Sequence, residues 1–145
     1  MADTSLGFRY RGRMYGDPDN PTIQDLLFKD NESLTKGDMV NLESGEVDLA
    51  ATGDTNLLGM VEEIDIDGTD STTRIRVYVD ADCIYGVYDP VARLKGATLD
   101  IAGATGAQTI ATSSNKEFVV WAESTAEQET LVVFNVGKHH NNKAQ

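Results

Sequence analysis

Residues 36–45, with the sequence KGDMVNLESG, decide the fold class, because a looser copy follows at residues 95–103, KGATLDIAG. Each copy begins with a Lys-Gly pair, continues with large side chains on alternate residues, and ends at a glycine. Alternation with a period of two between glycines indicates a short, half-buried strand. The recurrence therefore predicts a compact all-β body that contains two similar hairpin units.

Other segments support an all-β fold with one or two short helical turns. We expect a hairpin turn at Ser44-Gly45. We also expect helical turns at residues 22–28, which follow Asn20 and Pro21, and at residues 89–96, which begin with Asp89 and Pro90, because each pair supplies a capping residue and a proline. Trp121 lies in an apolar run and is expected in the core. The predicted strands are residues 34–42, 46–50, 57–66, 72–80, and the central strands 118–122 and 131–136.

The chain divides into four expected segments. Residues 1–16 form an N-terminal arm, residues 17–33 a connector with a short helix, residues 34–137 a β-barrel or β-tulip body, and residues 138–145 a polar, disordered tail. The net charge is −12, although residues 1–16 hold three arginines and one aspartate. An acidic body repels phosphates, so we predict no nucleic-acid partner. No apolar run approaches the roughly 20 residues that cross a bilayer, so we predict no membrane partner.

The N-terminal segment has two interpretations. If it is extended, aromatic residues lie on one face and arginines on the other. It is then a docking arm that becomes ordered on a partner, or an ordinary first strand of the body. Aromatic residues and arginine are enriched at interfaces, which favours the docking arm. The predicted docking residues are Leu6, Phe8, Arg9, Tyr10, Arg11, Arg13 and Tyr15.

Residues that could take part in catalysis or metal binding do not form a convincing active site or metal site in the sequence. Cys83 is expected to be a small buried residue, because a lone cysteine has no intramolecular disulfide partner. Residues 65–70, DIDGTD, lack the spacing of an EF-hand loop and are expected to form a hairpin tip. His139 and His140 offer too few ordered ligands for a metal. We therefore predict no enzyme activity, no cofactor and no metal.

Residues 34–47, LTKGDMVNLESGEV, followed by LLGMV at 57–61, resemble the capsid decoration (cement) proteins of tailed bacteriophages. The segments KGATLDI at 95–101 and FVVWA at 118–122 share this resemblance. It implies a structural protein of the virion, a β-barrel with an N-terminal arm. Such a protein is made in the host cytoplasm, binds the outer surface of an icosahedral phage head, and stabilises the capsid by bridging adjacent major capsid proteins. It also implies a homo-oligomer, with a trimer favoured over a dimer.

The alternative is a β-sandwich recognition module, such as a piece of a tail fibre or an adhesin that binds carbohydrate. Tyr85 and Tyr88 would then be exposed stacking platforms. A small β-barrel enzyme is a third and weaker hypothesis.

Overall fold

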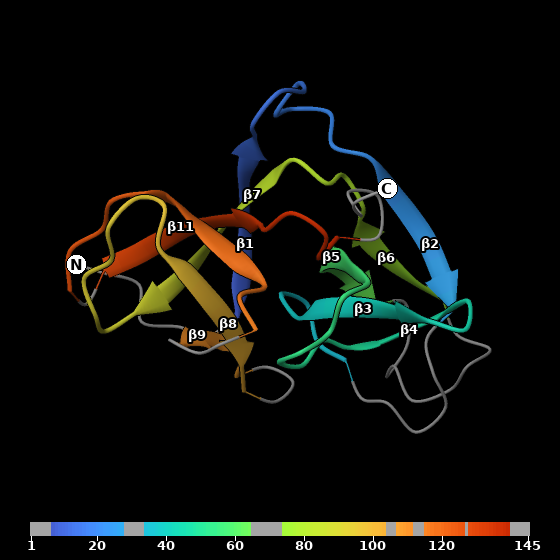
Figure 1. Ribbon diagram of the computed structural model, residues 1–145. Coiled ribbons are helices and arrows are strands. Elements are labelled where there is room, and N and C mark those ends of the chain that lie inside the picture. The colour runs from blue at the N-terminus through green and yellow to red at the C-terminus, as the bar shows by residue number, and fades with distance from the viewer. Residues whose placement is uncertain are drawn as a thin grey trace.

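The computed structural model of the chain describes residues 7–27, 34–64, 74–103, 107–111, 115–126 and 128–139. These residues form strands in two antiparallel sheets and contain no helix (Figure 1). The all-β prediction is therefore confirmed. The helical turns are wrong, because Ile23–Leu27 is strand β2 and the segment after Asp89 is an irregular loop. Residues 28–33 and the predicted hairpin tip at 65–70 lie outside the described ranges.

The two sheets have five and six strands. The five-stranded sheet has the order β2 (Ile23–Leu27), β6 (Arg74–Tyr78), β5 (Leu57–Ile64), β3 (Met39–Glu43) and β4 (Glu46–Leu49). The six-stranded sheet has the order β1 (Phe8–Arg13), β7 (Cys83–Asp89), β11 (Gln128–Phe134), β10 (Phe118–Ala122), β8 (Thr98–Ala102) and β9 (Thr109–Ala111).

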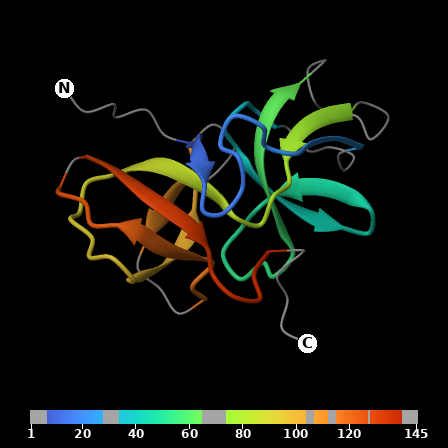
Figure 2. The same ribbon diagram turned by 90° about the horizontal axis from the view of Figure 1, so that it is seen from above.

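The sheets are two copies of one arrangement once β1 is set aside. We call the five-stranded sheet unit 1, and the strands β7-β11-β10-β8-β9 unit 2. Both units have the same antiparallel strand order, so β2, β6, β5, β3 and β4 correspond to β7, β11, β10, β8 and β9. A shift of 59 residues carries the Val40–Gly59 pair of unit 1 onto the Leu99–Phe118 pair of unit 2. The units lie side by side, with β3–β5 in teal and green and β8–β11 in yellow to red (Figure 2).

The Lys-Gly turns are equivalent in the two units. Gly37 N donates to Val61 O and Gly96 N donates to Val120 O, both at 3.0 Å. Each glycine has a positive φ, +94° and +88°, which a residue with a side chain rarely adopts. A β-bulge follows at the same place, after Val61 in β5 and after Val120 in β10. The repeated Lys-Gly motif in the sequence therefore predicts a real structural repeat.

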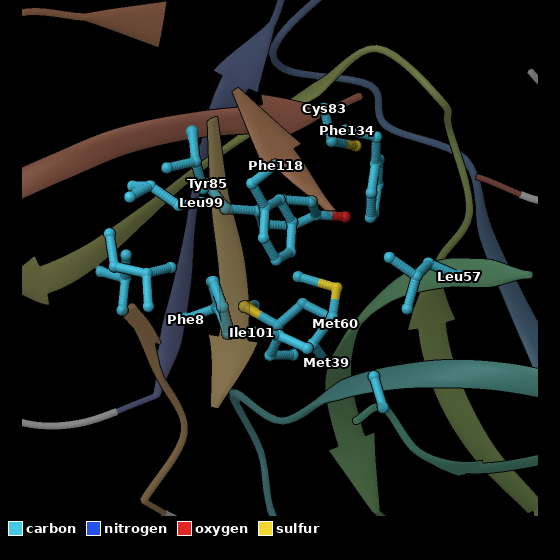
Figure 3. Close-up of a cluster of buried hydrophobic side chains, with 14 of the residues drawn as sticks. Phe8, Met39, Leu57, Met60, Cys83, Tyr85, Leu99, Ile101, Phe118 and Phe134 are labelled. Carbon is cyan, nitrogen blue, oxygen red and sulfur yellow. The ribbon is translucent and has the colours of Figure 1, made fainter. Parts of the chain in front are cut away.

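The buried hydrophobic residues form two clusters, of which the second joins the units. The first lies inside unit 1 and contains Val40, Val61, Ile75 and Val77 among its members. The second fills unit 2 and extends into unit 1 through Met39, Leu57 and Met60, which face the rings of Tyr85, Phe118 and Phe134 (Figure 3). The body is therefore one sandwich-like structure in which β3 and β5 contribute to both cores. As predicted, β10 and β11 are central strands.

Hydrogen bonds also cross between the units. The side chain of Gln108, before β9, is fully buried; it accepts from Met39 N and donates to the carbonyls of Met39 and Ala50. His139 is also buried, contacts the Phe134 ring, and its Nε2 lies 2.7 Å from Leu58 O on β5. The prediction of a disordered tail is therefore wrong at His139, whereas His140 lies outside the described residues.

Neither unit closes into a barrel. The end strands curl towards one another, β2 towards β4 and β7 towards β9. Among the described strands, no ladder joins either of these pairs, so both sheets stay open. The body predicted as a barrel is therefore a pair of strongly curled sheets. It includes residues 8–27, although the sequence predicts an arm and a connector there.

Candidate interaction surfaces

The predicted docking arm is an integral strand. β1 pairs antiparallel with β7, with Phe8 opposite Val87 and Tyr10 opposite Tyr85. Phe8 is buried and packs its ring against Phe118 with centroids 5.4 Å apart. Residues 8–13 are therefore a strand of the body, which is the second of the two interpretations. The prediction of a docking arm is wrong for these residues.

The arginines of β1 are held by a carboxylate of β11. Glu129 accepts from Arg9 Nε at 2.9 Å and from Arg11 Nε at 2.8 Å, reaching both by crossing β7 at Gly86. A side chain at Gly86 would collide with the Glu129 carboxylate, since an added Cβ would lie 2.3 Å from it. The hydrogen bond from Arg11, together with that from Arg9, lowers the pKa of Glu129. The two guanidinium groups therefore stabilise the sheet.

The end of β1 is tied to the loop before β7. Arg13 Nε donates to Asp82 at 2.9 Å, and the main-chain N–H groups of Tyr15 and Gly16 donate to the same carboxylate. Burial acts to raise the pKa of Asp82, but these hydrogen bonds lower it overall. Tyr15 itself is 87% exposed.

The predicted docking residues therefore have different environments. Tyr10 donates to Pro18 O at 2.6 Å and stacks on Tyr78 with centroids 4.8 Å apart. Together with Phe8 and the three arginines, it is engaged within the chain. Only Tyr15 is a predicted docking residue with an exposed ring, and Leu6 lies outside the described residues.

The described residues contain no evident catalytic centre. Cys83 is buried as predicted, and burial raises the pKa of its thiol to about 11, which disfavours the nucleophilic thiolate. No group of three or more His, Cys, Asp or Glu residues suited to a metal occurs among the residues described. Nor does this part of the chain contain a helix long and apolar enough to cross a membrane.

The carbohydrate alternative predicts that the rings of Tyr85 and Tyr88 are exposed, and one of them is not. Tyr85 is fully buried in the second cluster, and burial raises its pKa well above the ordinary value. Tyr88 is half-buried on β7. The expectation that both rings are exposed is therefore wrong.

An exposed apolar surface lies at the bulge of unit 2. Trp121 is the residue at the β10 bulge; it is half-buried and belongs to neither buried cluster, so the prediction of a core tryptophan is wrong. The Lys95 ammonium lies 5.6 Å from the centre of its ring. Leu94 is 70% exposed, and Val91 is also exposed. We call Val91, Leu94, Lys95 and Trp121 the Trp121 surface.

The Trp121 surface is held on a rigid support. Arg93 and Ser124 exchange two main-chain hydrogen bonds, and Val120 N donates to Ala97 O at 2.9 Å. The segment that carries Leu94 and Lys95 is therefore bound at one end to Ser124, just after β10, and at the other end to β10 itself. Arg93 is in turn paired with the buried Asp89 at 2.5 Å. An exposed apolar group on an ordered segment loses little conformational entropy on binding.

Unit 1 has polar residues at the equivalent positions. The 59-residue shift relates Leu94 to Thr35, Lys95 to Lys36, and Trp121 to Glu62. The Lys-Gly turn and the bulge have the same main-chain hydrogen bonds in both units. The fold therefore does not require apolar residues there. Sequence reasoning missed the surface because the run FVVWA is uniformly apolar, and the bulge that leaves Trp121 only half-buried has no local signal.

A comparison with known protein families finds no family that matches this chain. A comparison with curated proteins finds no match either.

Proposed function

We propose that this chain is a structural binding protein that decorates the outer surface of an icosahedral phage head and stabilises it by bridging adjacent major capsid proteins. The observation that carries the proposal is the Trp121 surface, a rigid apolar patch that the fold does not need. The resemblance to capsid decoration proteins is our reason for proposing a phage head as the partner. We therefore assign the attachment site to the Trp121 surface of unit 2, and not to the N-terminal residues.

The physical properties of the chain fit this role. Tryptophan is among the residues that supply most of the binding energy at interfaces. Apolar area removed from water contributes a further stabilisation of about 25 cal/mol per Å². The Trp121 surface has four residues, whereas a standard interface has about 20–30 residues on each side. Many copies on one shell, or a trimer of this chain, would compensate through multivalency. The net charge of −12 keeps the free protein soluble at high concentration.

The test is co-sedimentation with expanded phage heads assembled without this protein. The variant Leu94→Asp should bind about tenfold more weakly or worse, because it places a charge in the apolar interface. Val136→Asp is the matched control, since Val136 is 78% exposed and lies just after β11, at the opposite end of the β10–β11 hairpin from Trp121. Both variants should unfold at the wild-type temperature.

Equal binding of the two variants would contradict the assignment of the Trp121 surface, and absence of any binding to heads would contradict the decoration role. Binding to a glycan array in place of heads would favour the carbohydrate alternative. Light scattering of the free protein gives the oligomeric state, for which we expect a trimer.

A further inference from the structure

The edge strands are where the two units differ most. In unit 2, β1 runs antiparallel along β7, with Arg9 opposite Gly86. In unit 1, β2 is the end strand of its sheet, and within the described residues no strand pairs with its outer side. Figure 1 shows β2 at the periphery of the molecule, next to β6. One unit therefore has a strand added to its edge, whereas no described strand is added to the equivalent edge of the other unit.

The register shows which part of β2 corresponds to the covered part of β7. The pairs Val61–Val77 and Val120–Val132 precede the bulge in their units and are equivalent. Because Gln24 pairs with Val77, and Tyr85 with Val132, Gln24 takes the place of Tyr85. In the same register, Asp25 takes the place of Gly86. Residues 22–26, which are Thr22 and the first four residues of β2, are therefore the counterpart of residues 83–87, which β1 covers.

The main chain of β2 is oriented for an added strand. Val79 N donates to Thr22 O at 3.1 Å, so Thr22 forms a hydrogen-bonded pair with β6. In an antiparallel pair, the next residue, Ile23, and alternate residues after it direct their N–H and C=O groups to the other side. β4 approaches β2, but this leaves room for an added strand. In unit 2, the equivalent strand β9 approaches β7, and Thr109 Oγ1 donates to Tyr88 O, yet β7 still pairs with β1.

The charge at this edge indicates what binds there. The Asp25 side chain is 65% exposed, and it lies where Gly86 faces Arg9 in unit 2. Asp17 and Asp19, on the loop before β2, are also exposed, while Arg76 lies 3.8 Å from Asp25. A second copy of this chain would bring its own Asp25 to the same acidic edge. A basic side chain on the added strand would instead lie opposite Asp25, as like charges repel and opposite charges attract across a strand pair.

We infer that the outer edge of β2 binds an extended segment of a partner protein, antiparallel to residues 22–26, in which apolar residues alternate with basic ones. Main-chain hydrogen bonds supply the affinity and the alternating side chains supply the specificity. This site is separate from the Trp121 surface, and it does not depend on the partner being a phage head.

A blocked, fluorescent peptide with the sequence of residues 7–13, GFRYRGR, is a suitable probe, because β1 is the segment that fits the equivalent edge. We expect fluorescence anisotropy to show saturable binding to the whole protein, weakened by added salt. Amide NMR signals of residues 22–26 should shift, and those of β7 should not. Asp25→Lys should weaken binding at least about tenfold, whereas Glu123→Lys, an equal charge change at an exposed site after β10, should leave it within about twofold.

Ile23→Pro provides a second variant, because it removes one outward N–H group without removing a bond to β6. It should also lose binding while its unfolding temperature shows that it is folded. No binding of the probe at millimolar concentration, signal shifts confined to β7, or equal effects of Asp25→Lys and Glu123→Lys would each overturn the inference. Dimerisation of the protein through β2 would also overturn it.

Discussion

Unit 1 and unit 2 share a strand order, a Lys-Gly turn and a bulge, yet they expose different chemistry. Unit 2 has β1 on its edge strand and an apolar surface at its bulge, whereas unit 1 has an edge strand with no added strand in the described chain and a glutamate at its bulge. The shared features are the ones that main-chain geometry demands. The differences lie at positions that the geometry leaves to side chains, and those positions are where we propose that this chain binds its partners.

The largest loss of stability is expected from a substitution at a position where the units differ inside the core. Gly59 of β5 is equivalent to Phe118 of β10. An alanine at Gly59 would place its Cβ 2.0 Å from Tyr78 O, and φ is +156°. We expect Gly59→Ala to cost more than about 4 kcal/mol, or to prevent folding, because main-chain atoms cannot move aside. Gly96→Ala, which meets no atom within 4 Å, should cost about 1 kcal/mol in urea unfolding. Similar losses would contradict this contrast.

The second prediction concerns β1, which either packs into the core beside unit 2 or is a detached arm. Phe8→Ala should reduce the free energy of unfolding by about 3–5 kcal/mol, since it leaves a cavity among packed rings. Tyr15→Ala, at a ring that is exposed, should change it by less than about 0.5 kcal/mol. A cost below about 1 kcal/mol for Phe8→Ala would show that β1 is not part of the core in solution.

The smallest effect concerns the ion pairs that hold β1. The lowered pKa of Glu129 means that its charged form is favoured in the folded state, so its contribution to stability is present above its ordinary pKa of 4.5 and is lost as pH falls through the lower folded value. Glu129→Gln should cost about 1 kcal/mol at pH 7, and the difference from wild type should shrink below about pH 4. Glu123→Gln, at an exposed site, is the control; a pH-independent cost at Glu129 would contradict the mechanism.

Local patterns predicted a substantial part of this fold. The period-two alternation and the Lys-Gly repeat gave the all-β class and the paired hairpins, and Ser44-Gly45 is a turn with positive φ at both residues. The alternation at residues 8–11 also predicted aromatics on one side of a strand and arginines on the other. What it could not show is that Glu129, 120 residues from Arg9, would pair with these arginines.

The errors have a common cause in long-range pairing. Residues 22–28 carry good helix-start signals, yet β6 pairs with Ile23–Leu27 from about 50 residues away and satisfies its main chain as a strand. His139 lies in a polar stretch of the sequence, yet its Nε2 lies 2.7 Å from Leu58 O of β5, and its ring is buried there by this contact with a strand about 80 residues away. Trp121 reads as core, and the bulge in β10 places it outside both clusters.

The amino-acid sequence by itself determined the strand period, the positions of the Lys-Gly turns and the acidic charge of the body, because these depend on neighbouring residues and on composition. The tertiary structure alone decided which edge strand gains β1, where the arginines find their carboxylate, and which apolar residues remain exposed. Those outcomes depend on contacts between residues far apart in the chain, and strand register and bulges set them with no signal in the local sequence.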